Sequence, residues 1–375
     1  MFGFFKKKKP QEAPPPPPPP VTITRVEPTI EQKFAASLYA LLAGKPGNAF
    51  FSSYSIAAAL SMARAGAAGP TREEIVRAIG DQGPVDVAGE LCVANAIWHQ
   101  TGYPIRPEYV AALKAEVRDT DFAGATEESR GKVNAWAAQA TRDKIREVLP
   151  PGMLTALTRV LLANAIYFKA RWESVFEEHA TRPSPFTRLD GSRVDVPMMN
   201  QGGHFRSVRD GALQALEMPY QGLKVSMVLL LPDAGTFERE EKALDPGRVE
   251  GMIRAMTAEQ TVLSVPKFRI ESNYLLREAL ASLGIVKAFT SAADFTPISS
   301  EPGFALSEVV HRTYVDVNEW GTEAAAVTIA GLAGCAPPKR IVEFRCDRPF
   351  VFIIRDRATG APIFMGRVVT PSPSG

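Results

Sequence analysis

The sequence has few of the residues from which metal sites and disulfide frameworks are usually built. Its 375 residues include only three cysteines, Cys92, Cys335 and Cys346. An odd number of cysteines leaves at least one thiol free. The four histidines lack the paired spacing of a metal site and stand at His99, His179, His204 and His311. We therefore expect no metal centre, no cofactor and no disulfide scaffold.

Catalytic motifs are absent as well. The sequence holds no phosphate-binding glycine loop, no Gly-x-Ser-x-Gly elbow and no His-Glu-x-x-His helix. Cys335 offers a thiol, but no motif places a base and an orienting residue beside it. The net charge is +2, and outside residues 1–27, which hold five basic and two acidic side chains, 38 basic side chains face 39 acidic ones. We expect neither an enzyme nor a nucleic-acid-binding protein, which would carry a basic patch.

No apolar run approaches the roughly 18 residues of a membrane span. The N-terminal segment 1–27 starts with Phe and Lys residues and continues into seven consecutive prolines, Pro14–Pro20. A secretory signal has its charges before a longer apolar run, and here the order is reversed. We expect a disordered polyproline tail, a short disordered C-terminus at 372–375 and, without a signal peptide, a cytoplasmic protein. The alternative is a Phe/Lys tip presented to a membrane surface or a partner.

Helix and strand patterns mix along residues 28–371 without a strict βαβ order, which predicts an α+β domain. Thr29 with Gln32 resembles a capping box that starts a first helix, whose apolar face is Phe34, Leu38, Leu41 and Leu42. Val160–Phe168 is a nearly continuous apolar run, which predicts a central strand covered on both faces. Further helices are expected at 56–65, 71–79, 133–140 and 274–283. Further strands are expected at 50–51, 91–98, 215–218, 224–231, 261–268, 341–344, 349–355 and 363–369.

The stretch 318–349 departs from an ordinary core strand. On a strand of period two, alternate residues share one face. One face would carry only small uncharged side chains, those of Thr322, Ala324, Ala326, Thr328 and Ala330. The other would carry Glu323, Ala325, Val327 and Ile329. Such a small face can enter a crowded site, although an Ala-rich run on its own favours a helix.

Four blocks of the sequence resemble the serpin family. Glu319–Thr328 resembles the proximal hinge of inhibitory serpins, and Asp347–Asp356 resembles the family's C-terminal signature. Asn164–Trp172 and Asn48–Ile56 are similar to two further serpin blocks, and all four stand in the expected order. The chain is therefore identified as a member of the family, of the inhibitory, prokaryotic-like type, over residues 28–371.

The resemblance implies a metastable serpin fold with a large mixed central sheet, smaller sheets, about eight helices and an exposed reactive-centre loop at about 319–340. It also implies suicide inhibition. A serine protease attacks the loop and forms an acyl-enzyme, and the hinge then inserts as a new strand of the central sheet. The implied hinge residues are Glu319, Gly321, Thr322, Glu323, Ala324, Ala325, Ala326, Val327 and Thr328.

Counting from Gly321 as in most inhibitory serpins places the reactive bond between Cys335 and Ala336. Counting back from Pro349 allows a bond up to three residues later. Cleavage after Ala336 or Pro337 would put proline in the leaving position, where its ring and its missing N–H are poorly tolerated. The bond Cys335–Ala336 is therefore preferred.

The side chain of Cys335 indicates the class of target protease. It is medium-sized, uncharged and polarisable, which suits an elastase-like or chymotrypsin-like specificity pocket. Leu332 is an internal alternative, and Arg340 is an alternative that would suit a trypsin-like protease. Oxidation of the Cys335 thiol would change the side chain that the protease recognises, so a redox switch is a further hypothesis.

Other residues match the family by position. Trp172 falls at the top of the sheet, and Glu319 with Lys267 matches an ion pair there. The polar cluster that lies below the centre of the opening sheet is expected from Ser52, Ser55, Asn164 and His311. The alternative is an ordinary core cluster, and both interpretations predict that the hydrogen bonds are met. Titration of His311 would make insertion pH-sensitive.

The sequence departs from the family at two places. Trp320 stands just before the hinge glycine, where the family usually carries a charged residue, and we expect it to be tolerated outside the inserting face. Only about ten residues separate Gly80 from Leu91, where the family has a helix, so we expect a turn there. A sulfated-polysaccharide site on that helix is therefore not expected.

Two function classes stay open. The first is a monomeric inhibitor of serine proteases, and the second is a non-inhibitory serpin that acts as a carrier or a chaperone-like binding protein. Bulky, charged or proline residues on the inward face of 322–328 would favour the second, and this chain has none there. Because the family often works outside cells, the extracellular space is the alternative to the cytoplasm.

Overall fold

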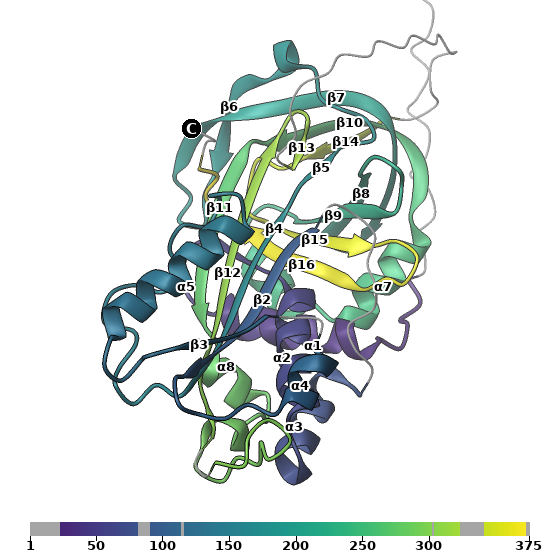
Figure 1. The fold of residues 1–375 in the computed structure, drawn as a ribbon. Helices are drawn as coiled ribbons and strands as arrows, with labels where there is room; N and C mark the ends of the chain where they lie inside the picture. Colours follow the sequence, from purple (N-terminus) through teal and green to yellow (C-terminus); the bar gives the residue numbers. More distant parts are fainter. Residues whose placement is uncertain (1–22, 82–90, 114–115, 302–303, 323–340, 373–375) are drawn as a thin grey trace, which may run out of the picture.

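The structure, a computed structural model, describes residues 23–81, 91–113, 116–301, 304–322 and 341–372. In this part of the chain two large β-sheets form the body, α5 lies across one of them, and α1 to α4 and α8 gather at one end (Figure 1). The helices are α1 (Ile30–Leu42), α2 (Ser53–Ala65), α3 (Gly69–Ile79), α4 (Pro107–Ala112), α5 (Thr126–Ala140), α6 (Phe237–Lys242), α7 (Pro246–Ala255) and α8 (Arg277–Ser282), with 3-10 helices η1 (Glu178–Ala180) and η2 (Lys287–Phe289). The predicted α+β class is confirmed.

The first sheet has seven strands in the order β3-β2-β4-β12-β13-β5, with β11 also paired to β12. The strands are β2 (Leu91–Gln100), β3 (Glu116–Thr120), β4 (Val160–Phe168), β5 (Ala170–Arg171), β11 (Phe268–Leu275), β12 (Leu306–Asn318) and β13 (Gly321–Thr322). The predicted central strand is β4, which is buried along its whole length. It runs parallel to β12, and this pair forms the seam of the sheet, where Asn164 lies opposite His311.

The second sheet has nine strands in the order β1-β16-β15-β9-β8-β7-β10-β14, with β6 also paired to β7. The strands are β1 (Ala49–Phe51), β6 (Arg182–Thr187), β7 (Arg193–Asp210), β8 (Leu213–Pro219), β9 (Val225–Pro232), β10 (Thr257–Pro266), β14 (Val342–Arg345), β15 (Phe350–Asp356) and β16 (Pro362–Val368). Every residue of β9, β15 and β16 is buried. Such strands read as apolar runs because both faces lie in the core.

The first helix shows how the sequence sets local structure. Thr29 caps α1 and forms the predicted capping box with Gln32. Leu41 was assigned to the apolar face, but it is 38% exposed, so this assignment was wrong. The remaining apolar side chains of that face, Phe34, Leu38 and Leu42, are buried in the main core.

Several boundaries differ from the prediction; α5, for example, begins at Thr126 rather than at Val133, and two other differences have a local cause. The strand expected over 261–268 ends at Pro266, and β11 begins at Phe268, because a proline cannot donate to a β-ladder. The helix expected over 274–283 begins only at Arg277, because Tyr274 still pairs with His311 across β11 and β12.

Several predictions fall on residues that are not described. The proline-rich stretch 1–22, the turn expected at 82–90 and the C-terminus 373–375 lie outside the described residues. Within the described ranges, no helix is both long and apolar enough to cross a membrane. The same part of the chain holds no group of three or more His, Cys, Asp or Glu residues that could bind a metal ion.

Candidate functional site at the seam and top of the seven-stranded sheet

A buried polar cluster lies beneath the seam between β4 and β12. The Ser52 N–H donates to His311 Nε2 at 3.0 Å, and the Ser52 hydroxyl donates to the carbonyl oxygen of Ile363 at 2.7 Å. Asn164 bridges the cluster, because its Oδ1 pairs with His311 Nδ1 and its Nδ2 donates to Ser55 Oγ. None of these polar side chains has any exposed surface, and their hydrogen bonds are met. The structure therefore brings together the four residues predicted for this position.

The contacts of His311 define its protonation. Because Nε2 accepts from the Ser52 N–H, Nδ1 is the nitrogen that carries the proton and donates to Asn164. Burial lowers the pKa of His311 to about 3. A second proton would need Nε2, where it would face the Ser52 N–H inside a dry site. The ring is therefore neutral at physiological pH.

The top of the sheet is held by Glu319, which follows β12. Its carboxylate pairs with Lys267 Nζ at 3.0 Å and accepts from the Thr181 hydroxyl at 2.8 Å. Burial acts to raise the pKa of Glu319, but hydrogen bonds from its own backbone N–H, Thr181 and Lys267 outweigh it and hold this pKa below the usual value. The predicted pair of Glu319 and Lys267 is thus present, with the carboxylate buried.

Trp172 contacts the backbone on either side of Glu319. Its ring stacks on Tyr220 with 4.4 Å between centroids, and its Nε1 donates to the Asn318 carbonyl at 3.0 Å. The backbone N–H of Trp172 donates to the Trp320 carbonyl at 2.9 Å. The end of β12 is therefore fixed to the segment that follows β5.

The first two residues after the turn at 319–320 already lie within the sheet. Gly321 and Thr322 form β13, which pairs antiparallel with β12 on one side and with β5 on the other (Figure 1). A Cβ at Gly321 would lie 2.1 Å from the Ala170 carbonyl oxygen, so only glycine fits between the strands. Thr322 has no exposed surface, and its Oγ1 lies 2.7 Å from the Tyr220 hydroxyl.

The rest of the predicted loop lies outside the described residues. This holds for hinge residues Glu323 to Thr328, for the proposed reactive bond between Cys335 and Ala336, and for the alternatives Leu332 and Arg340. Within the described part of the chain, Cys346 is a free and buried thiol, and burial raises its pKa.

A serpin family model, described as serine protease inhibitor, matches residues 29–371. The chain belongs to the serpin family. A serpin-like protein of Thermococcus kodakarensis is 38% identical to it over 362 residues, which are 90% of this chain and 84% of that relative. Leukocyte elastase inhibitor of Bos taurus is 34% identical over 371 residues, which are 90% of this chain and 98% of that protein.

Solved serpin structures share the fold. Human thyroxine-binding globulin complexed with thyroxine superposes with a TM-score of 0.83 at 29% identity, over 92% of this chain and 98% of that chain. The family thus includes members whose names describe protease inhibition and members whose names describe ligand binding.

Sequence reasoning missed three residues of this serpin's site. Tyr220 contacts both Trp172 and Thr322, Thr181 contacts Glu319, and Asn95 on β2 accepts from Asn164. None of them belongs to the matched blocks. Asn95 alone gave a signal, because it is a polar residue inside the apolar run predicted as strand 91–98.

Proposed function

We propose that this serpin is a suicide-substrate inhibitor of serine endopeptidases with elastase-like or chymotrypsin-like specificity. The observation that carries the proposal is the position of Thr322, which is fully buried between β12 and β5. A strand continuing from Thr322 would pass between β12 and β4, where only side chains without charge can enter at low cost. The small uncharged residues at alternate positions from Thr322 to Ala330 meet this requirement.

The chemistry belongs to the target protease. Its serine hydroxyl attacks the Cys335 carbonyl, the bond to Ala336 breaks, and Ala336 leaves as a free amine that takes the proton from the protease histidine. An ester then joins Cys335 to the protease. The seam of this serpin opens as the freed hinge enters, and the 14 steps from Gly321 to Cys335 span roughly 45 Å as a strand.

This displacement supports trapping of the protease. A protease pulled across the length of the body is distorted at its catalytic centre, and loss of one oxyanion-hole donor slows deacylation on the order of 100-fold or more. Inhibition therefore requires that insertion of the hinge is faster than hydrolysis of the ester.

The experiment mixes the serpin with elastase-like and chymotrypsin-like proteases and looks for an adduct that survives denaturing electrophoresis. Mass spectrometry of the released peptide reads the bond, and we expect a peptide that begins at Ala336. Thr322→Arg should yield cleavage without adduct, because a charge would be buried in the sheet. Glu323→Arg is the matched control on the opposite face and should keep the adduct. Clean cleavage of the wild type, with no adduct, would refute inhibition of these proteases.

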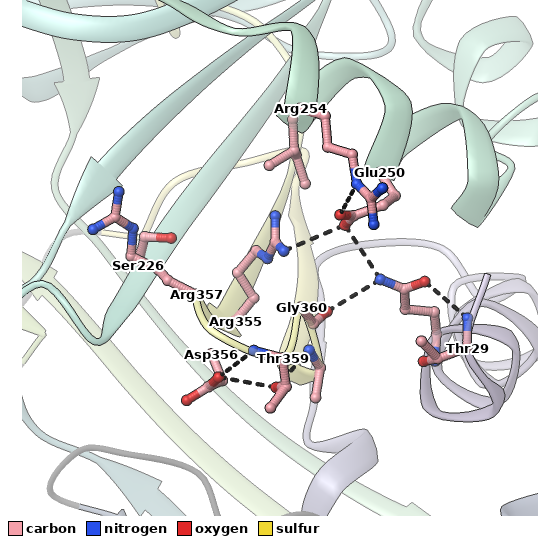
Figure 2. Close-up of polar contacts among 12 residues, drawn as sticks. Thr29, Ser226, Glu250, Arg254, Arg355, Asp356, Arg357, Thr359 and Gly360 are labelled. Carbon is pink, nitrogen blue, oxygen red and sulfur yellow. Dashed lines mark hydrogen bonds and ion pairs between the residues drawn. The ribbon is translucent and has the colours of Figure 1, made fainter. Parts of the chain in front are cut away.

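A second candidate function is ligand carriage, and one observation favours it. A cavity of about 340 Å³ lies between α1, α7 and the strands β9, β15 and β16. Its volume falls in the range of small-molecule sites. Arg355 lines it, is 6% exposed and leaves its buried Nε without a hydrogen-bond partner. Figure 2 shows Glu250 between Arg355 and Arg254. Its carboxylate pairs with both guanidinium groups, so Arg355 shares this ionic partner with Arg254.

Glu241, Asp245 and Glu250 line the cavity as well, so it suits a small, largely apolar molecule whose hydrogen-bond-accepting group binds Arg355. Titration with anilinonaphthalene sulfonate tests this function. Arg355→Met should weaken binding at least about tenfold if the guanidinium binds the sulfonate, and Arg357→Met, whose side chain binds Glu217 instead, should not. Equal binding by all three proteins would remove the support for a carrier.

A further inference from the structure

The uncleaved chain holds the start of its hinge inside the sheet. Gly321 and Thr322 are paired on both sides, and Thr322 has no exposed surface. The Cβ clearance at Gly321 shows that this docking is tight, since the Ala170 carbonyl and the Arg171 backbone would both collide with a side chain. Two residues of the future strand are therefore in place before any bond is cut.

Tyr220 is the side chain that receives Thr322. Its ring is 1% exposed, stacks on Trp172 and meets Phe168 edge-on with 4.9 Å between centroids. Burial raises the pKa of Tyr220, so the hydroxyl keeps its proton and shares a hydrogen bond of 2.7 Å with Thr322 Oγ1. Without Thr322 this hydroxyl would have no other hydrogen-bond partner among the described residues, and an unpaired hydroxyl in an apolar site is costly.

The turn before Gly321 is fastened separately. The Phe176 N–H donates to the Glu319 carbonyl at 2.9 Å, and the Trp320 indole N–H donates to Glu178 Oε1 at 3.1 Å. The Arg171 guanidinium lies over the Trp320 ring at 5.9 Å from its centroid. Trp320 thus binds the segment that follows β5, and its side chain replaces the charged residue that the family usually carries there.

We propose that Tyr220 and Thr322 form a latch that keeps the hinge docked in the uncleaved serpin, with Trp320 holding the turn. Tyr220 and Trp320 are positioning residues. The latch makes insertion an extension of an existing strand rather than the formation of a new one, which avoids the cost of first contact between separated segments. This consequence rests on the proposed inhibitory function, whereas the docking itself does not.

The docking is tested without a protease, by the rate at which synthetic peptides anneal into the sheet, followed by native electrophoresis. A peptide with the sequence of residues 322–334 can anneal in full only if it displaces Thr322 of β13 from the sheet. A peptide of residues 324–334 can anneal without displacing it. Tyr220→Phe and Thr322→Val each leave one buried hydroxyl unpaired and free the hinge. We expect each to accelerate annealing of the longer peptide about three- to tenfold and to leave the shorter peptide unchanged.

The double variant provides the decisive readout. Because it removes both hydroxyls, no polar group is left unpaired, and the annealing rate should return toward that of the wild type. If the two substitutions only loosened the local structure, their effects on the annealing rate would instead add. Tyr109→Phe is the matched control, since its hydroxyl is also buried and donates to the Met62 carbonyl at 2.8 Å, far along the chain from the hinge. Additive effects, or equal acceleration by Tyr109→Phe, would overturn the latch.

The inhibitory consequence has its own readout. Each single variant should raise the number of serpin molecules consumed per protease trapped by about two- to fivefold. Insertion would be slower, so more of the acyl-enzyme would be hydrolysed before the protease is trapped. If the wild type traps no protease but the annealing pattern holds, the proposed function fails and the latch stands. If the wild type traps protease and the annealing pattern is absent, the latch fails alone.

Discussion

The two sheets of this serpin are both buried but are held together in different ways. In the nine-stranded sheet, Phe50 stacks on Phe364 and Phe352 with centroids 5.1 and 5.7 Å apart. Phe352 also meets Phe268 of β11, in the seven-stranded sheet, at 5.3 Å. Beneath the seam of the seven-stranded sheet, the contacts of Asn164 and His311 are hydrogen bonds between polar side chains. Stacked aromatic rings thus pack β1, β15 and β16 of the nine-stranded sheet, whereas a polar cluster lies beneath the seam between β4 and β12.

The difference supports the proposal that the seam is the part of the fold that opens. Aromatic rings packed in a core lose contact area as soon as they move apart, so the nine-stranded sheet resists any change. Hydrogen bonds in the polar cluster are directional and can be exchanged for others, and β4 and β12 form a parallel pair, which is slightly less stable per residue than an antiparallel one. Both features support the proposal that the hinge inserts at this seam.

Removal of an aromatic ring from the nine-stranded sheet should have the largest effect on the free energy of unfolding. Phe352→Ala should lower the free energy of unfolding by about 3–5 kcal/mol, because Phe352 is fully buried among other rings. Urea unfolding measures this loss. Among the molecules that remain folded, adduct formation with a protease should be unchanged. A loss below about 1 kcal/mol would show that this sheet is not the rigid part.

Removal of the central polar residue at the seam should have a smaller effect. Asn164→Ala leaves His311 Nδ1 and Ser55 Oγ without their partner, and we expect a loss of about 2–3 kcal/mol in the uncleaved protein. The loss should appear as faster thermal conversion to inactive forms as well as easier urea unfolding. Stability equal to that of the wild type would show that the cluster does not hold the seam.

The seam should also be the acid-sensitive part of the body. The pKa of His311 in the folded protein is about 3, below its ordinary value of 6.5, so its contribution is fully present above pH 6.5 and is lost as the pH falls toward 3. Between pH 6.5 and 5 the free energy of unfolding should fall by about 2 kcal/mol. His311→Gln should remove this slope, and His204→Gln, at an exposed position, should keep it. A slope that survives His311→Gln would assign it to another group.

The ion pair at the top of the sheet should have the smallest effect. Lys267→Met removes the partner of Glu319, whose carboxylate keeps its bond from Thr181, so we expect a loss of about 1 kcal/mol. The loss should shrink in high salt because the lysine is partly exposed. Unfolding curves at two salt concentrations measure both effects, and a loss near 3 kcal/mol would mean that the pair acts as a fully buried one.

The elements that could be predicted have strong local patterns. The capping box at Thr29 and the apolar run of β4 were recognised because residues close in sequence define them. β7 and β12 were missed, since β7 contains Pro197 and two glycines, and β12 carries Glu308, Arg312 and Asp316 among its apolar residues. Both strands take their form from their neighbours in the sheets rather than from their own pattern.

The site residues likewise divide into those that the sequence predicts and those that it does not. Ser52, Asn164 and Glu319 were found because they lie in blocks that resemble a family. Tyr220 was missed because its contact with Thr322 joins residues 102 positions apart, and nothing around Tyr220 in the sequence marks it. The docking of β13 was missed for a related reason, because it depends on the fit of Gly321 against the Ala170 carbonyl.

The central claim is that the seam accepts the hinge as a new strand after cleavage. Thermal unfolding of the intact and the loop-cleaved protein tests it most directly. The account predicts that cleavage raises the melting temperature of the wild type by at least about 10 °C, because insertion adds a paired strand between β4 and β12. Thr322→Arg should show no such rise. An unchanged melting temperature after clean cleavage of the wild type would contradict the account, because the loop would then have stayed outside the sheet.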